Sequence, residues 1–242
     1  MPTLVYGTTS IDYTLEYQEN KTDISVTVEW LDGVNVRAPE GISEETLQQV
    51  LYKKAPWILR KWNEFSEING DVLIKEFVSG EKFSYLGRQY RLKVIKREEA
   101  AKASLLYSQG KFLAEVPARF SSEETKEALR KMFKAWYVKN GEKKLKERIE
   151  LYGPKMLVTP SKTALKEQKM RWGTCTPAHA IYLNWRLVMA PIAILDYVLV
   201  HEMAHIKYPN HSADFWRFVA SILPDYEQQK EWLRVNGPML TL

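Results

Sequence analysis

The chain has 242 residues, a formal net charge of +5, 45% hydrophobic and 27% charged residues, and one cysteine, Cys175. This composition is typical of a globular protein with one large or two small domains. A single cysteine excludes an intramolecular disulfide, and the longest apolar stretch, about Leu187–Val200, contains Pro191 and Asp196 and is too short to span a bilayer. Because the N-terminus also lacks a signal-peptide pattern, we expect a cytoplasmic protein without a membrane segment.

The first half of the chain is rich in predicted strands and shows no evident internal repeat. A helix is expected from Ser43 to about Phe65, kinked or split at Pro56. Asp32-Gly33 predicts a tight hairpin turn. Alternating or β-favouring residues predict strands at eight places: Ile11–Tyr17, Ile24–Trp30, Val34–Arg37, Val72–Val78, Phe83–Leu86, Tyr90–Ile95, Ser104–Tyr107 and Phe112–Val116.

Much of the positive charge lies in residues 126–148, where the spacing of apolar residues predicts a long amphipathic helix. Ser121 or Ser122 is expected to cap its N-terminus, with Glu124 completing a capping box. The basic face of this helix is a candidate for attracting nucleic acid or nucleotide phosphates. Glutamates interleaved with the basic residues favour the alternative, a solvated face.

Two further strands are expected at Ala164–Trp172 and Ile181–Leu187, paired in an antiparallel sheet that borders the functional site. An exposed edge of such a sheet can bind an extended peptide as an added strand. Arg171 and Arg186 lie in these strands and are candidate substrate or transition-state contacts. The alternative for both is an ordinary arginine on the surface of a strand.

Three of the four histidines lie close together, in His201-Glu202-Met203-Ala204-His205 and at His211. Residues 192–200 are almost all apolar and predict a buried helix that begins at Pro191. Histidines four residues apart share one face of a helix, so His201 and His205 can bind one ion. Buried imidazole and carboxylate groups are costly unless they are satisfied, and zinc binds neutral imidazole. The pattern is that of zinc hydrolases, in which the glutamate activates water.

A third zinc ligand is expected from the way this helix ends. Pro209 disfavours helical geometry at Tyr208, so the chain can turn and present His211 to the same ion. Ser212 is then well placed to cap the next helix. Asp225 is a competing third ligand, although its spacing favours a role as the N-cap of the last helix.

The ligand set favours a catalytic zinc over a structural one. Structural zinc usually has four protein ligands, mostly cysteines, whereas this chain offers only Cys175. Closing the site with Cys175 and His179 would leave Glu202 without a role. We therefore expect one zinc per chain, an open coordination position and Glu202 as general base. Cys175 beside His179 is a separate candidate nucleophile, but no neighbouring residue marks its thiol as activated.

Several motifs together carry a resemblance to a known family, most strongly over residues 160–235. They are Arg171-Trp172-Gly173-Thr174-Cys175, Asn184-Trp185-Arg186-Leu187, His201-Glu202-Met203-Ala204-His205, Asn210-His211-Ser212, Phe215-Trp216 and Pro224-Asp225-Tyr226, with weaker motifs at Val36-Arg37-Ala38-Pro39, Ala55-Pro56-Trp57-Ile58 and Tyr85-Leu86-Gly87-Arg88-Gln89-Tyr90. The chain resembles the YgjP-like metallopeptidases, which are related to the SprT-like and WLM zinc proteases. Thr174 stands where the family often has serine. The resemblance implies zinc held by His201, His205 and His211, with Glu202 as general base, and no known substrate.

These observations predict an α+β protein. A β-rich N-terminal lobe with one helix (residues 1–118) should precede a zincin-like metallopeptidase domain (119–242) with the active-site helix and a bordering antiparallel sheet. The expected function is zinc-dependent hydrolysis of a peptide or protein substrate. The alternatives are zinc-dependent hydrolysis of a non-peptide bond, such as a nucleotide phosphoanhydride, and a DNA-associated protein-processing module.

Overall fold

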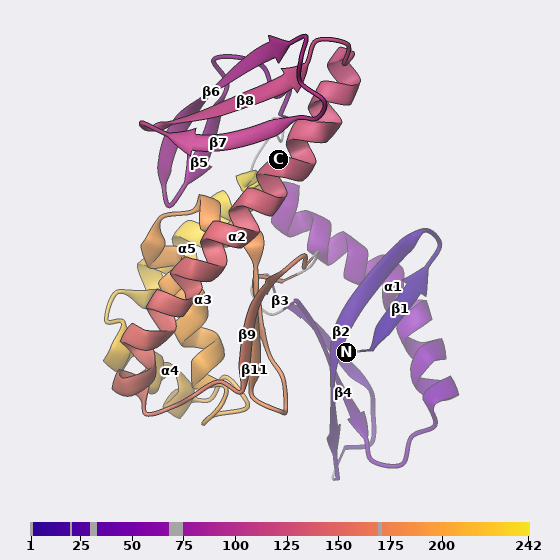
Figure 1. The fold of residues 1–242 in the computed structure, drawn as a ribbon. Coiled ribbons are helices and arrows are strands. Elements are labelled where there is room, and N and C mark those ends of the chain that lie inside the picture. Colours follow the sequence, from indigo (N-terminus) through magenta and orange to yellow (C-terminus); the bar gives the residue numbers. More distant parts are fainter. Residues whose placement is uncertain (1, 20, 30–32, 68–74, 169–170) are drawn as a thin grey trace. The chain divides into compact units, whose positions relative to one another are not determined.

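The computed structural model describes residues 2–19, 21–29, 33–67, 75–168 and 171–242 (Figure 1). The fold is α+β, as expected, and its two four-stranded sheets each combine parallel and antiparallel pairs. The chain divides into two compact units, which are Met1–Gly70 with Gln168–Thr174, and Asp71–Glu167 with Cys175–Leu242. The domain boundary expected near residue 118 falls inside the second unit and stays a prediction. Within the described residues, no helix combines the length and the apolar character needed to cross a membrane.

In the first unit a four-stranded sheet packs against one helix. Its elements are β1 (Thr3–Tyr6), β2 (Thr9–Gln18), β3 (Ser25–Glu29), β4 (Gly33–Pro39) and α1 (Glu44–Glu67). The strand order is β1-β2-β4-β3, with the central pair parallel and the two outer pairs antiparallel. Val34, Val36 and Ala38 of β4 are buried in one cluster with Leu47 and Leu51 of α1, so this unit has an apolar core of its own.

The strands predicted in this unit are confirmed as β2, β3 and β4, while β1 has no counterpart among the predictions. Glu29 lies opposite Gly33 in the antiparallel pair β3–β4, as the predicted hairpin requires. The turn itself, residues 30–32, lies outside the described residues.

The first helix is not split at Pro56, so that part of the prediction is wrong. Helix α1 runs without interruption through Pro56 to Glu67. Pro56 is exposed, and so is Tyr52, whose carbonyl loses its helical partner when residue 56 has no N–H. Water can therefore satisfy that carbonyl. On the buried side, Leu51, Ala55 and Ile58 continue the apolar contact of the helix with the sheet.

The second unit begins with a sheet built on the same plan as the first. Its strands are β5 (Lys82–Tyr85), β6 (Arg88–Arg97), β7 (Ser104–Ser108) and β8 (Lys111–Pro117), in the order β5-β6-β8-β7. In both sheets the four successive strands have 4, 10, 5 and 7 residues, and the inner pair is parallel. A serine, Ser43 or Ser121, then accepts a backbone N–H at the start of each following helix. The chain thus contains a structural repeat that its sequence does not reveal.

The four strands predicted between Phe83 and Val116 are confirmed as β5 to β8, but the strand predicted at Val72–Val78 is not. Residues 72–74 of that segment lie outside the described residues, and residues 75–78 form no strand. Phe77 has a positive φ of 57°, and the carboxylate of Glu81 accepts the backbone N–H groups of Glu76 and Phe77. This local hydrogen bonding replaces a strand ladder.

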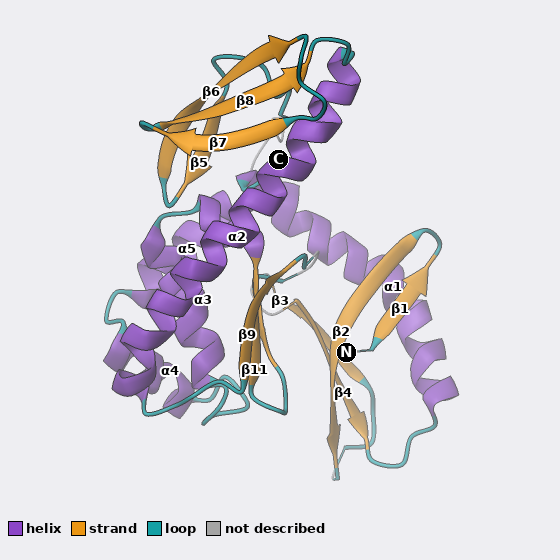
Figure 2. Ribbon diagram, in the orientation of Figure 1, coloured by secondary structure: helices purple, strands orange, loops and turns teal. Residues whose placement is uncertain are grey.

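Helix α2 (Ser122–Met156) is the predicted long helix, with Ser121 as N-cap and the expected capping box to Glu124. In its first half, Phe133 stacks on Phe83 of β5 with ring centroids 4.1 Å apart. Its second half lies beside a group of helices (Figure 2). The remaining elements are β9 (Lys162–Lys166), β10 (Gly173–Cys175), β11 (Ala180–Asn184), the 3-10 helix η1 (Trp185–Met189), α3 (Ile192–Ala204), α4 (Ala213–Ile222), α5 (Tyr226–Asn236) and the 3-10 helix η2 (Gly237–Met239).

The sheet formed by β9 and β11 differs from the prediction in two ways. The pair is parallel, with Ala180 opposite Lys162, not antiparallel. Parallel strands need a crossover connection, and the chain between these two includes β10. Both strands are also shorter than predicted: β9 ends at Lys166, and β11 ends at Asn184, whose side chain caps η1 by accepting the N–H of Arg186.

The tip of the β5–β6 hairpin supports the start of α3. Leu86 and Gly87 both have positive φ, 48° and 78°, as a two-residue type I′ turn requires. Their N–H groups donate to the carbonyls of Val188 and Met189 at 2.8 and 3.3 Å, at the end of η1. A Cβ at Gly87 would lie 2.9 Å from the Cα of Pro191, so only glycine fits here without displacement.

We expect Gly87→Ala to destabilise the protein by about 2–4 kcal/mol, because it adds both backbone strain and a clash with main-chain atoms. Gly110→Ala is the matched control: Gly110 has a φ of 71° but open space around its Cβ position. The Gly110→Ala variant should lose only the part of the stability that comes from backbone strain. Denaturant unfolding of the three proteins measures the difference, and equal losses in the two variants would contradict the close packing of Gly87.

Candidate active site

Helix α3 is buried on nearly all sides, and it carries two of the predicted site residues. His201 is 0% and Glu202 1% exposed, among apolar neighbours such as Val198 and Leu199. The helix ends at Ala204, somewhat before the predicted end at Tyr208, with His205 as its C-cap. Tyr208 still donates its N–H to the carbonyl of Ala204 at 2.9 Å, so the turn continues towards Pro209.

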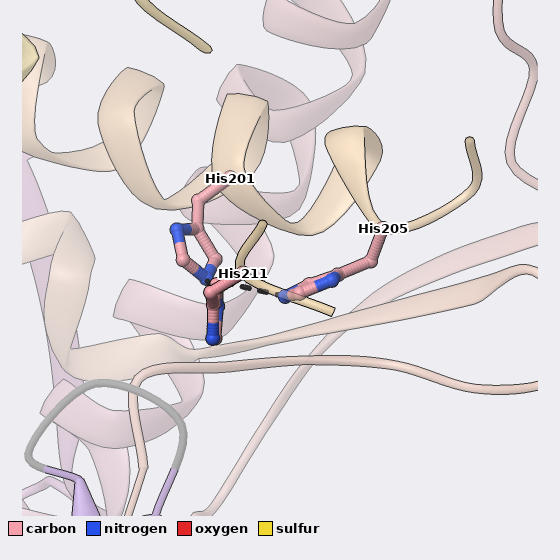
Figure 3. Close-up of side chains that lie close together, drawn as sticks. All are labelled: His201, His205 and His211. Carbon is pink, nitrogen blue, oxygen red and sulfur yellow. Dashed lines mark hydrogen bonds between the residues drawn. The ribbon is translucent and has the colours of Figure 1, made fainter. Parts of the chain in front are cut away.

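The three predicted histidines converge (Figure 3). Nε2 of His201 lies 3.3 Å from Nε2 of His205 and 3.0 Å from Nε2 of His211. One ring nitrogen from each histidine lies within 4.8 Å of those of the other two. For nitrogens bound to a tetrahedral zinc at 2.0–2.1 Å, the expected separation is about 3.3 Å. The spacing of these ring nitrogens therefore fits a single zinc ion.

A hydrogen bond fixes the orientation of the His205 ring. Its Nδ1 lies 3.1 Å from the backbone carbonyl of Tyr208, and a carbonyl only accepts, so Nδ1 carries the proton. In a neutral imidazole Nε2 then has a lone pair, and this is the nitrogen that faces His201. Support of a ligand histidine by a carbonyl on its other nitrogen is the usual arrangement around protein-bound metals.

His211 enters the site from the segment between α3 and α4. Ser212, the next residue, caps α4 by accepting the N–H of Phe215 at 3.3 Å, as predicted. Asp225 is the N-cap residue of α5, without a side-chain capping bond. Among the described residues, the group of possible metal ligands consists of the three histidines and does not include Asp225.

Arg186 lies in η1, not in a strand, and its guanidinium is engaged by Glu167. The same carboxylate accepts from Nζ of Lys134 and from the indole N–H of Trp185, at 2.5 and 2.9 Å. Burial alone would raise the pKa of the Glu167 carboxyl, but these donors outweigh it and lower the pKa to about 2. The cluster ties η1 to α2, and a substrate contact by Arg186 stays a prediction.

Arg171 belongs to the first unit. It is 4% exposed and donates to the backbone carbonyl of Asp12 at 3.0 Å. A buried arginine held this way supports the packing of its own segment. Its predicted role as a substrate or transition-state contact likewise stays a prediction.

Cys175 is unsuited to act as a nucleophile. Burial raises the pKa of its thiol to about 12, and the negative charge of Glu202 adds to the effect. The reactive form of a cysteine is the thiolate, which is scarce at neutral pH when the pKa is this high. The structure therefore opposes the cysteine hydrolase considered from the sequence.

A partly buried ion pair, in which the carboxylate is buried and the guanidinium is partly exposed, fixes α3 against α2. Arg148 donates to both carboxylate oxygens of Asp196 at 2.6 and 2.7 Å, and the hydroxyl of Tyr152 lies 3.2 Å from the same carboxylate. Asp196 is only 5% exposed and precedes His201 by little more than one turn. The available signal in the sequence was an acidic residue, Asp196, inside the otherwise apolar stretch 192–200.

Comparison with known families identifies the domain type of this chain. A family model described as YgjP-like, metallopeptidase domain, matches residues 22–236 and defines the chain as a metallopeptidase-domain protein, a class of hydrolases that use a bound metal, usually zinc. The chain belongs to the YgjP-like family, as its motifs indicate. No curated protein and no solved structure matches it.

Proposed function

We propose that the protein is a zinc-dependent peptidase whose metal ligands are His201, His205 and His211. The observation that carries the proposal is the convergence of three imidazole nitrogens at separations suited to one tetrahedral ion. Three protein ligands leave a coordination position open, which is the arrangement of catalytic zinc. A zinc ion here would supply Lewis acidity, which lowers the pKa of water and polarises a carbonyl group.

Glu202 is the residue that handles protons in this proposal. It follows His201 on the same helix and is 1% exposed, so its carboxylate is shielded from bulk water. It would accept a proton from the attacking water and deliver it to the leaving amine nitrogen of the peptide. Its negative charge adds to burial in raising the pKa of the Cys175 thiol, which indicates that the two side chains are near each other.

The contacts of α2 do not favour nucleotide or nucleic-acid substrates over peptides. Five of the nine basic residues in 126–148 are paired within the protein: Lys126 with Glu76, Lys131 with Glu127, Lys134 with Glu167, Lys144 with Glu147, and Arg148 with Asp196. This supports the solvated-face interpretation. Phosphoanhydride hydrolysis, the DNA-associated module and the cytoplasmic location stay predictions.

Metal content is the measurement that tests the proposal. We expect about one zinc per wild-type chain by elemental analysis. His211→Ala should lose most of the zinc, because only two of the three proposed ligands remain. Asp225→Ala should keep the zinc. Loss of zinc in the Asp225 variant alone, or no zinc in wild type after zinc is supplied at neutral pH, would contradict the three-histidine site.

A further inference from the structure

A column of aromatic rings begins at His211. The imidazole of His211 stacks on the indole of Trp216, with centroids 5.5 Å apart and an interplanar angle of 21°. Trp216 stacks in turn on Tyr226 at 5.3 Å and 18°, and Tyr226 on Tyr197 at 6.4 Å and 23°. We refer to His211, Trp216, Tyr226 and Tyr197 as the aromatic column.

The column leads back to another of the three histidines. Tyr197 contacts His201 edge-on, with centroids 6.1 Å apart, and Trp216 contacts His201 directly at 5.6 Å. The members come from α3, the α3–α4 segment, α4 and α5, so the rings connect elements that are separate along the chain. Nζ of Lys230 lies 4.5 Å from the centroid of Trp216, a cation–π contact that further fixes the indole.

Such support matters most for His211. His201 lies on a buried helix and His205 at its C-terminus, where backbone hydrogen bonds fix their positions. His211 lies in a non-helical segment, so more freedom of its backbone and ring must be removed before it can bind a metal. A flat indole, itself stacked on Tyr226, restricts the imidazole to one plane.

We propose that Trp216 is a positioning residue for His211, with Tyr226 supporting it from within the column. The inference rests on the proposed zinc site. Trp216 would orient the ring of His211, as the backbone carbonyl of Tyr208 orients the ring of His205. Removing an interaction that orients a metal ligand typically weakens metal binding by about 10–100-fold. We expect a loss of this size when Trp216 is replaced by alanine.

The test is the zinc affinity of the whole 242-residue chain, measured by competition with a chelator, for wild type and four variants. Trp216→Ala should bind zinc about 10–100-fold more weakly, and Trp216→Phe, which keeps a flat ring, should recover most of the loss. Trp232→Ala is the matched control, since Trp232 is a half-buried tryptophan of the neighbouring helix α5. Tyr226→Leu, which removes the support behind the indole, should show a smaller loss.

A double variant separates positioning from general destabilisation. If Trp216 acts through His211, adding Trp216→Ala to His211→Ala should weaken zinc binding no further. Wild-type affinity in Trp216→Ala, equal losses in Trp216→Ala and Trp232→Ala, or additive losses in the double variant would overturn the positioning role while leaving the zinc site intact. If Trp216→Ala does not fold, Tyr226→Leu decides by the same comparison: a loss larger than that of Trp232→Ala supports the positioning role, and an equal or smaller loss overturns it. Failure of wild type to bind zinc would overturn both proposals.

Discussion

Replacing Glu202 with glutamine is expected to reduce peptide hydrolysis by about 10²–10⁴-fold, the usual contribution of a general base. Glutamine keeps the size of the side chain, which matters at a position that is 1% exposed, but it cannot accept the proton from water. The zinc content should not change, because Glu202 is not one of the converging ligands. Turnover of a casein-type substrate and elemental analysis of the same samples measure both quantities.

Glu150→Gln is the control for this variant. It makes the same change in charge at an exposed position of α2, and it should leave both turnover and zinc unchanged. Full turnover in Glu202→Gln would exclude Glu202 as the general base. Phosphate release from nucleotides, measured on the same proteins, tests the alternative substrate class: Glu202-dependent release without peptide cleavage would replace the peptidase assignment.

The largest expected loss of stability follows the removal of Asp196. Asp196→Ala leaves the guanidinium of Arg148 and the hydroxyl of Tyr152 without their shared carboxylate. Breaking a buried ion pair on one side typically costs about 3–5 kcal/mol. For a chain of this length, that corresponds to a fall in melting temperature of roughly 6–20 °C. Thermal unfolding followed by circular dichroism measures it.

A combined variant tests whether the loss comes from the uncompensated partners. Arg148→Met, Tyr152→Phe and Asp196→Leu together remove every polar group of the cluster, and buried ion pairs can often be replaced by apolar residues without net cost. We expect this protein to melt close to wild type. If it melts at as low a temperature as Asp196→Ala, the loss of stability is caused by altered packing around residue 196 and not by the broken ion pair.

Local signals in the sequence predicted the elements whose boundaries depend on local chemistry. The capping box of Ser121 and Glu124 places the start of α2 correctly, and the cap at Ser212 does the same for α4. The β9–β11 sheet depends instead on pairing between distant segments. The alternation over Ile181–Leu187 suits a strand, but the side chain of Asn184 starts η1 within it.

In the candidate site, too, some features follow from local sequence and others depend on packing between distant segments. The histidine spacing alone was enough to predict which three imidazoles converge, because His201 and His205 share a helix face and Pro209 follows closely. The roles of Asp196 and Trp216 depend on how α2, α4 and α5 pack around α3, which no local pattern specifies. In the sequence Trp216 stands out only as part of the Phe215-Trp216 motif, and no local pattern shows that its ring stacks on His211.

The first unit is discontinuous in the chain, and this affects how the protein can fold during synthesis. Residues up to Gly70 hold its sheet and helix, but Gln168–Thr174 complete it. At about 5–20 residues per second, the ribosome needs roughly 5–20 s to make the intervening stretch. During that interval the backbone carbonyl of Asp12 cannot yet accept its hydrogen bond from the guanidinium of Arg171. The sheet and helix of this unit are therefore completed by a segment that is translated only shortly before α3, the helix that carries His201 and Glu202.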